Sequence, residues 1–180
     1  GEISPHQIWR AASHAQEAGE APARDIQKFL SEVAWRDFSH HLLYHDPEMG
    51  HLSWRRQFEN VDWRTGSKSE LEAWRRGQTG YPIVDAGMRE LWTTGYMHNR
   101  VRMLVASFLT KHLLIDWRAG EQWFWDTLVD ADYGSNAVNW QWTAGSGVDS
   151  NMFVRIMAPL SQSEKFDAAR YIRQWVPELS

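Results

Sequence analysis

The 180-residue sequence predicts an all-α fold, and two kinds of pattern support this prediction. Apolar residues recur every three or four positions in several stretches, as they do on the buried face of a helix. Proline, glycine and capping residues bound these stretches where helices begin and end. Alternation of apolar and polar residues, which would indicate strands, is not found, so we expect one helical domain over residues 1–180.

Two helices are predicted at the start of the chain. Ser4 and Pro5 form a helix start, because a capping hydroxyl precedes a proline at the first helical position, and Gly19 ends this helix. A longer helix is predicted from residue 23 to about residue 45. Its apolar stripe consists of Ile26, Phe29, Leu30, Val33, Phe38 and Leu42.

The middle of the chain alternates irregular and helical stretches. Residues 47–66 are irregular and aromatic, and Ser67 and Glu70 then have the spacing of a capping box that opens a short helix closed by Gly77. The segment 98–115 is strongly apolar after a polar first turn and is expected to be a central buried helix. Further helices are predicted over residues 82–95, 119–129 and 167–175.

The stretch 130–142 departs from this pattern. Asp130 and Asp132 precede Gly, Ser and Asn residues, which favour turns, and Trp140 and Trp142 follow. Neither helical nor strand periodicity runs through it, so we expect a long irregular loop around residues 130–160. Carboxylates and carboxamides beside aromatic faces suit a flat heterocycle. A surface connection with two tryptophans packed beneath it is the alternative.

The composition limits the classes of function. The absence of cysteine excludes disulfides and thiolate metal sites, and it fits a reducing compartment. The apolar runs are too short for a membrane span, so no membrane partner is expected. The net charge of −4 means that DNA binding would need a local basic patch. Tryptophans usually anchor cores and interfaces, and most of the twelve are expected to do so, but their number raises the question of a second role for some of them.

Three histidines, His40, His41 and His45, could suggest a metal site. Positions 41 and 45 share a helical face, but no cysteine or acidic partner completes a zinc pattern. We therefore predict no metal site.

Two groups of polar side chains are predicted to share helix faces. Asn99, Arg102 and Met103 lie together at the start of the helix 98–115, where an arginine needs an acidic partner that Asp130 or Asp132 would provide. In the second predicted helix, Glu32, Trp35 and Arg36 stand at i, i+3 and i+4. Ordinary salt bridges and helix packing are the alternative explanation of both groups.

Several segments, in order along the whole chain, resemble the DNA photolyase/cryptochrome family, and most closely its cyclobutane pyrimidine dimer photolyases. The segments are YPIVDAGMR (81–89), MHNR (97–100), LIDWR (114–118), NWQW (139–142) and EKFD (164–167) followed by YIRQWVPEL (171–179).

The resemblance implies a bound FAD. Asn136 would face the flavin N5, Asp132 would accept a hydrogen bond from the flavin N3–H, and Asp130 would pair with Arg102 beside the ring. The residues implied to bind the cofactor are Arg36, Asn99, Arg102, Asp130, Asp132 and Asn136. The antenna chromophore is not indicated.

The implied reaction is light-driven repair of damaged DNA. Excited reduced FAD donates an electron to the pyrimidine dimer, the dimer splits and the electron returns. Photolyases are among the enzymes that flip the damaged base out of the duplex. The implied catalytic residues are Glu32, Asn136 and the electron-transfer tryptophans Trp140, Trp117 and Trp63. The implied DNA and substrate contacts are Glu32, Trp35, Asn99, Arg100, Met103, Trp142 and Arg155.

In the family, a Thr/Ser-rich loop that holds the flavin phosphates precedes this part of the domain, and an antenna-binding α/β domain is also present. Neither is in this sequence, so we expect a truncated domain that binds FAD weakly or not at all by itself. The resemblance also implies a cytoplasmic location and a monomeric complete protein. Tyr96 and Phe29 replace tryptophans that are usual in the family, which is expected to retune the flavin site.

Two alternatives to repair remain at this point. One is a cryptochrome, which would use the same fold and flavin for light signalling. Asn99 and Met103 argue against it and against the (6-4) class, which usually has paired histidines near position 98. The other is a helical interaction module without a flavin, in which the tryptophans are core residues.

Overall fold

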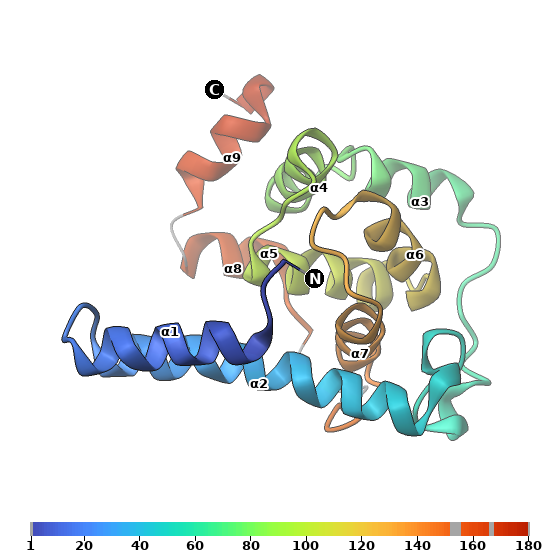
Figure 1. The fold of residues 1–180 in the computed structure, drawn as a ribbon. Coiled ribbons are helices and arrows are strands. Elements are labelled where there is room, and N and C mark those ends of the chain that lie inside the picture. Colours follow the sequence, from blue (N-terminus) through green and yellow to red (C-terminus); the bar gives the residue numbers. More distant parts are fainter. Residues whose placement is uncertain (1, 152–155, 166–167, 180) are drawn as a thin grey trace. The chain divides into compact units, whose positions relative to one another are not determined.

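The computed structural model describes residues 2–151, 156–165 and 168–179 (Figure 1). Helices and turns account for these residues, and no strand occurs among them, which confirms the all-α prediction. No helix within the described ranges has the length and apolar character needed to cross a membrane. The chain divides into two compact units, Gly1–Pro47 and Glu48–Ser180.

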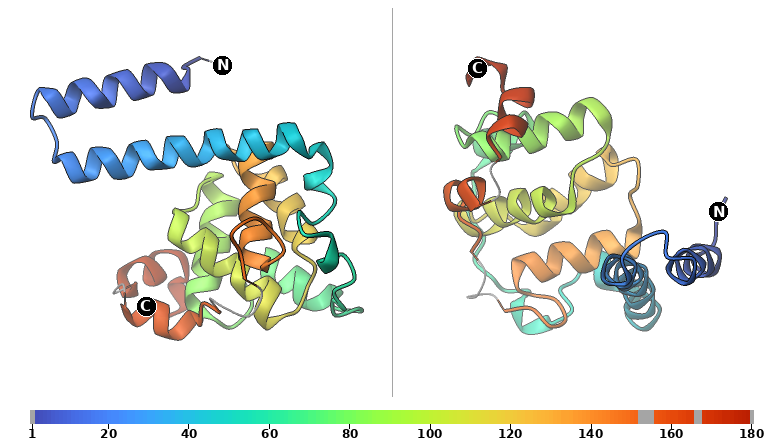
Figure 2. Two further views of the ribbon diagram at one scale, coloured as in Figure 1. Left: turned by 90° about the horizontal axis from the view of Figure 1, so that it is seen from below. Right: turned by 90° about the vertical axis from the view of Figure 1, so that its left-hand side faces the viewer.

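The first unit is a hairpin of two helices, α1 (Pro5–Glu17) and α2 (Ala23–His45), which lie side by side in both views of Figure 2. The Ser4 hydroxyl accepts a hydrogen bond from the Gln7 N–H, and the Gln7 side chain accepts one from the Ser4 N–H at 2.8 Å. This reciprocal capping satisfies two donors that the first turn cannot. The predicted bounds of both helices are confirmed.

The prediction that Phe29 belongs to the buried stripe of α2 is wrong. Leu30 and Leu42 are buried, whereas the side chain of Phe29 is 50% exposed. Adjacent residues of a helix point about 100° apart, so a helix that buries one stripe through Leu30 leaves Phe29 beside it.

The second unit contains the remaining elements. They are the short 3-10 turns η1 (Pro47–Gly50), η2 (Arg56–Phe58) and η4 (Pro177–Leu179), the π-helical turn η3 (Phe108–His112), and the α-helices α3 (Lys68–Arg75), α4 (Pro82–Thr94), α5 (Asn99–Ser107), α6 (Trp117–Thr127), α7 (Tyr133–Ala144), α8 (Pro159–Lys165) and α9 (Ala169–Trp175). The predicted start at Pro82 and stop at Gly95 are confirmed, and Gly95 has the left-handed conformation with φ 71° that ends many helices.

The predicted irregular loop is wrong over residues 133–144, which form helix α7. A side-chain oxygen of Asp132 accepts a hydrogen bond from the Ser135 N–H at 2.8 Å and caps the first turn, and Gly145 ends the helix with φ 92°. The buried residues follow one side of the helix, but Asn136, Gln141 and Gly134 are among them, so the apolar spacing that identifies amphipathic helices is missing. Residues 159–165, in α8, are helical as well.

Two smaller predictions also need correction. The helix after Ser67 exists, but its capping box does not: the Ser67 hydroxyl donates to the Arg64 carbonyl at 3.4 Å, and Glu70 pairs with the Arg64 guanidinium. The central helix predicted over 98–115 ends its regular α-helical part at Ser107 and continues as the π-helical turn η3.

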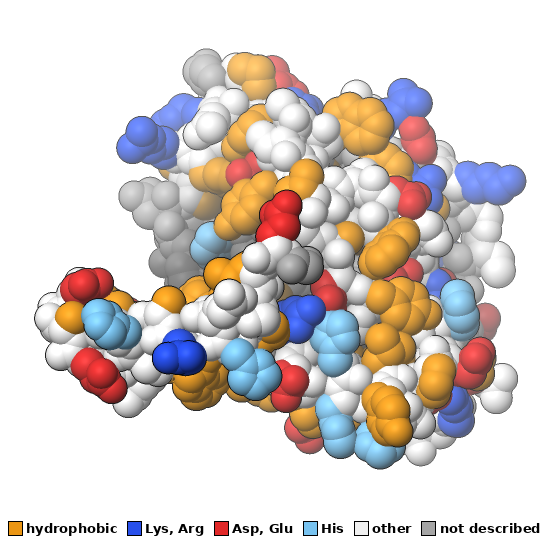
Figure 3. Space-filling model, in the orientation of Figure 1, with side chains coloured by type: hydrophobic (Ala, Val, Ile, Leu, Met, Phe, Trp, Pro, Cys, Tyr) orange, Lys and Arg blue, Asp and Glu red, His pale blue; other side chains and the backbone are white. Residues whose placement is uncertain are grey.

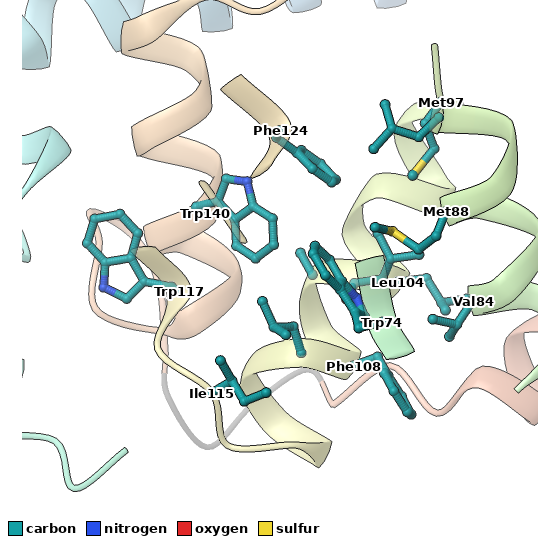
Figure 4. Close-up of a cluster of buried hydrophobic side chains, with 14 of the residues drawn as sticks. Trp74, Val84, Met88, Met97, Leu104, Phe108, Ile115, Trp117, Phe124 and Trp140 are labelled. Atoms are coloured by element: carbon teal, nitrogen blue, oxygen red, sulfur yellow. The ribbon is translucent and has the colours of Figure 1, made fainter. Parts of the chain in front are cut away.

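The core of the second unit is built around indole rings (Figure 4). Trp74 and Trp117 are fully buried, and Trp140 is 2% exposed. The Trp74 indole N–H donates to the Val105 carbonyl at 3.1 Å, so this polar atom is satisfied inside the core. The core therefore joins α3, α5, α6 and α7 through aromatic contacts.

A buried amide ties the irregular stretch 49–54 to α7. The Gln141 side chain is almost fully buried; its oxygen accepts from the Trp54 N–H at 2.7 Å, and its nitrogen donates to the Leu52 carbonyl at 3.2 Å and to the Met49 carbonyl. These bonds satisfy main-chain groups that have no regular secondary structure of their own.

The helices α6 and α7 approach closely at Gly120. A Cβ atom placed on Gly120 would lie 2.1 Å from Cη2 of Trp140 and 2.7 Å from Cδ2 of Leu109. No side chain larger than a hydrogen atom fits there without moving the indole.

We expect Gly120→Ala to lower the free energy of unfolding by about 1–3 kcal/mol through overpacking. At an exposed helix position, replacement of Gly by Ala would instead raise the free energy of unfolding by up to about 1 kcal/mol. Urea unfolding followed by circular dichroism measures the difference. The exposed Gln122→Ala in the same helix serves as control and should change stability by less than about 0.5 kcal/mol. A Gly120→Ala chain as stable as the original would contradict the close approach.

Candidate functional site

Three predicted site residues lie on one face of α7. Asp132, Asn136 and Trp140 are four residues apart, so their side chains follow one another along the helix. Asp132 caps the helix and is half-buried, Asn136 is 9% exposed, and Trp140 reaches into the core. The face thus offers a carboxylate, an amide and an aromatic edge in order of increasing depth.

The predicted pairing of Arg102 with Asp130 is confirmed. Their Nη2 and Oδ2 atoms are 2.9 Å apart, and Arg102 Nε donates to the Met97 carbonyl at 2.6 Å. The guanidinium also lies 5.6 Å from the centroid of the Tyr96 ring. Because the Asp130 side chain is 52% exposed, this ion pair contributes little to stability and mainly fixes the position of the arginine.

The first turn of α5 carries the other predicted residues of the second unit. Asn99 and Arg100 are exposed and Met103 is half-buried. His98 caps this helix, because its Nδ1 accepts a hydrogen bond from the Arg100 N–H at 3.2 Å. Asn99, Arg102 and Met103 share one face, as their spacing predicted.

Glu121 is a site residue that the sequence analysis missed. Asn136 Nδ2 donates to the Glu121 main-chain oxygen at 3.0 Å and to its Oε1 at 2.9 Å. Burial raises the pKa of the Glu121 carboxyl, while the Asn136 hydrogen bond and the charge of His51 oppose the rise. One signal existed: Glu121 lies on the apolar face of α6 with Trp117 and Phe124, at i−4 and i+3.

The tryptophans predicted for electron transfer belong to one core. Trp140 and Trp117 are buried within it (Figure 4), and Trp63 is half-buried against it. The aromatic rings that pack against Trp140 are those of Phe124 and Trp74. The Phe124 centroid lies 5.0 Å from the Trp140 centroid and the Trp74 centroid lies 6.2 Å from it, and both contacts are edge-on. Neither ring was predicted as part of the site.

The predicted residues of the first unit lie on an exposed part of α2. Glu32 forms an ion pair with Lys28, one turn earlier. The Trp35 side chain is 55% exposed and touches the Phe38 ring edge-on, with centroids 5.7 Å apart. Because residues 23–45 are helical, Glu32, Trp35 and Arg36 do share a face, as predicted.

The other predictions about the site have different outcomes. Trp142 is half-buried on α7, and Arg155 lies outside the described residues.

His41 and His45 pack edge-on with centroids 4.5 Å apart, and the described part of the chain holds no group of three residues suited to a metal ion. The face shown in Figure 3 intersperses basic side chains with acidic and apolar ones.

A separate groove of about 760 Å³ opens in the second unit, away from the polar face of α7. Apolar side chains of Ile83, Val101 and Leu104 line it, together with Glu90 and Tyr171. Among the described residues that line it, Arg100 is the one predicted site residue. The groove alone therefore does not define the site.

Comparison with known proteins decides the family. Residues 29–180 match the family model described as the FAD binding domain of DNA photolyase. The chain belongs to this family. The two structural units thus contain a known flavin-binding domain type, and the polar face of α7 lies within the matched residues.

Relatives of this FAD-binding domain are close in sequence and structure. The deoxyribodipyrimidine photo-lyase of Agrobacterium fabrum is 57% identical over 180 residues, which are 99% of this chain and 37% of the relative. The crystal structure of a class III photolyase from Agrobacterium tumefaciens has a TM-score of 0.92 at 57% identity, over 99% of this chain and 36% of that one. A Synechocystis cryptochrome has a TM-score of 0.90 at 39% identity, over 98% and 36%. The chain thus spans little more than a third of these relatives.

The cap of α7 generates a prediction. Asp132→Ala should lower the free energy of unfolding of the domain by about 1 kcal/mol, because the Ser135 N–H loses its partner, whereas Asn also caps well and Asp132→Asn should cost a few tenths of a kcal/mol. Urea unfolding by circular dichroism compares the two. Equal stabilities of the Ala and Asn variants would show that the cap contributes nothing.

Glu121 gives the stability of the domain a pH dependence. Its folded-state pKa lies above the ordinary value, so the folded protein binds the proton more tightly than the unfolded chain does. The stabilising contribution of Glu121 to the free energy of unfolding is therefore fully present below the ordinary pKa of a glutamic acid. It is lost as the pH rises through the raised pKa of the folded state. Denaturant unfolding from pH 4 to 8 should show this fall in the original chain and a smaller one in Glu121→Gln. Identical pH profiles would refute the assignment.

Proposed function

We propose that this chain is the FAD-binding, catalytic part of a deoxyribodipyrimidine photo-lyase, which uses light to repair cyclobutane pyrimidine dimers in DNA. The observation that carries the proposal is one face of α7, where Asp132, Asn136 and Trp140 lie in line within the matched family segment. The relatives that bear this name span nearly the whole chain.

The side chains of the second unit fit the edge of a flavin ring. An isoalloxazine presents N–H donors and carbonyl and ring-nitrogen acceptors along one edge, so it needs both kinds of partner. Asp132 would accept from the flavin N3–H, and Asn136 would face N5. Arg102, held by Asp130 and the Met97 carbonyl, supplies a fixed positive charge. Asn99 and Arg36 are further proposed cofactor contacts.

When bound, FAD supplies the light-driven electron transfer. The protein's own residues have other tasks. Trp140 closes the inner end of the polar face with an apolar wall, which excludes water and strengthens the electrostatic interactions there. Trp140, Trp117 and Trp63 are proposed as the series that carries electrons to the site.

The proposed substrate contacts place the damaged DNA. Trp35 and Trp142 would offer aromatic faces to bases, and Arg100 and Arg155 would neutralise phosphates. Glu32 would hydrogen-bond the damaged base, and Asn99 and Met103 are further proposed substrate contacts. We further propose that residues 1–180 form part of one helical domain of a monomeric, cytoplasmic protein.

The proposal is tested with the complete protein and an oligonucleotide that contains one thymine dimer. Blue light should restore the absorbance of the separated thymines at 260 nm, and the dark reaction should not. Glu32→Gln should slow repair by roughly tenfold or more, because a hydrogen bond to a charged group contributes about 1.5–3 kcal/mol.

Glu72→Gln provides the matched control for this test. Glu72 is an exposed acid that pairs with a basic residue four positions away, as Glu32 does, but it lies on α3 outside the proposed site. Its repair rate should stay within twofold. Stoichiometric FAD without repair would refute repair and favour light signalling, and a protein unable to bind FAD would refute the flavin site itself.

A further inference from the structure

Resting on the proposed function, we infer that Arg55 and Lys111 are positioning residues for the loop 145–150. They hold this loop, and the proposed base contact Trp142 before it, in the shape that receives damaged DNA. The loop follows helix α7 and precedes Arg155, the proposed phosphate contact, in the sequence. Its shape therefore bears on how far apart the two proposed contacts lie.

Lys111 holds the end of α7. From the π-helical turn η3, its ammonium donates a hydrogen bond to the Ala144 carbonyl at 2.6 Å. The last carbonyls of a helix lack partners within the helix and carry partial negative charge, so a cation is favourable there for both reasons. Burial lowers the pKa of the Lys111 ammonium, as expected of a cation that lies against protein and not in water. The last turn of α7, which carries Trp142, is thus attached to a neighbouring element.

Arg55 holds the other end of the loop. Its Nη2 donates to the Ser150 carbonyl at 2.5 Å, and its main-chain N–H donates to the Ser146 carbonyl at 3.0 Å. The guanidinium also lies 5.9 Å from the centroid of the Phe58 ring. One residue from a distant part of the sequence thus attaches the loop at two points. Both attachments are to main-chain oxygens, so they fix the path of the loop itself.

The loop folds back onto the last turn of α7. The N–H groups of residues 145–147 all donate to the Gln141 carbonyl, at 2.9, 3.0 and 3.1 Å. A Cβ atom on Gly147 would lie 3.0 Å from Cβ of Gln141 and 3.1 Å from the Trp142 nitrogen, so the main chain of the loop packs directly against the helix. A shift of the loop therefore also shifts the surroundings of Trp142.

Two features of the loop cost free energy. The Ser146 hydroxyl is buried and has no hydrogen-bond partner among the described residues, so its bonds to water are lost without replacement. Asp149 has φ 51°, a left-handed conformation that is uncommon for a residue other than glycine. Such costs gather at functional segments, where surrounding contacts enforce a shape that the chain would not adopt by itself. Arg55 and Lys111 supply contacts of this kind.

The two cations act on DNA only through the loop. Each is bonded to a protein carbonyl, so neither is needed as a phosphate contact. Binding of undamaged DNA depends mainly on charge, whereas a flipped dimer is recognised by side chains placed to receive it. Loosening of the loop should therefore weaken binding of the lesion and leave the charge-driven part of DNA binding in place.

The first test measures hydrogen–deuterium exchange in the complete protein by mass spectrometry. Lys111→Met and Arg55→Met each remove a donor and keep an unbranched side chain. In each variant the amides of residues 145–147 should exchange roughly tenfold faster or more, because the loop loses an attachment, while those of α4 stay within about twofold. Lys111→Arg keeps a cationic donor and should restore most of the protection. Unchanged exchange in the Met variants would overturn the inference.

The second test measures binding in the dark to an oligonucleotide with one thymine dimer and to its undamaged counterpart, over a range of salt concentrations. Both Met variants should bind the dimer roughly fivefold more weakly or worse, because preorganised contacts are lost, and the undamaged DNA within about twofold of the original protein. Lys111→Arg should recover dimer binding. If one Met variant does not fold, the other carries the test, since the two cations hold opposite ends of the loop.

The salt dependence separates positioning from direct contact. The slope of log K against log salt should be the same in the Met variants as in the original protein, because neither cation displaces counterions from DNA. Arg100→Gln removes a proposed phosphate contact and should reduce the slope by about 0.9. A reduced slope in Arg55→Met or Lys111→Met would overturn the inference, because the cation would then contact the DNA itself.

Arg76→Met and Lys68→Met are the matched controls. Both residues are exposed at the ends of α3, and their variants undergo the same chemical changes as Arg55→Met and Lys111→Met. Binding of both DNAs should stay within about twofold. A loosened loop with unchanged dimer binding would overturn the role toward the substrate. If the complete original protein does not prefer dimer DNA, the proposed function fails, and the exchange test still decides whether the two cations hold the loop.

Discussion

The close packing of α6 against α7 at Gly120 is the constraint on which the candidate site depends. The absence of a side chain at Gly120 lets the Trp140 indole lie against the backbone of α6. At this short separation the amide of Asn136, one turn before Trp140, reaches both the main-chain and the side-chain oxygen of Glu121. One apolar contact in the core thus sets the geometry of a buried polar contact.

The same arrangement places core residues and candidate site residues on one helix, α7. Its inner residues belong to the aromatic core, and its N-terminal residues carry the polar groups of the site. Core packing permits very little movement, because protein interiors are as dense as organic crystals. Asp132 and Asn136 are therefore held in place by the core residues of the same helix, and such a rigid scaffold preorganises the candidate site.

Much of the helical framework could be predicted from the sequence because its signals are local. Ser4 with Pro5, and Pro82 with Gly95, mark helix ends through residue-specific backbone chemistry, and the structure confirms them. Helix α7 could not be predicted from its periodicity, since its buried side includes a glycine, an asparagine and a glutamine and its first turn contains residues typical of turns. The cap at Asp132 was visible, but it was interpreted as part of a loop.

The candidate site likewise contains one contact that the sequence could predict and one that it could not. The pairing of Arg102 with Asp130 could be predicted in two steps: a buried arginine requires an acid, for which Asp130 and Asp132 were the candidates, and the family resemblance then implied Asp130. The contact of Glu121 with Asn136 depends on the crossing of two helices, which no local pattern specifies. An acid on the apolar face of α6 was the one clue that sequence alone offered.

Gln141 has a consequence for how this protein can change over evolutionary time. Its amide bonds only to main-chain atoms of residues 49, 52 and 54, never to their side chains. The path of that segment is thus fixed by a residue elsewhere in the chain, and most substitutions within it would leave these bonds intact. Sequence drift should be tolerated along the segment, whereas replacement of the single glutamine would release all three attachments at once.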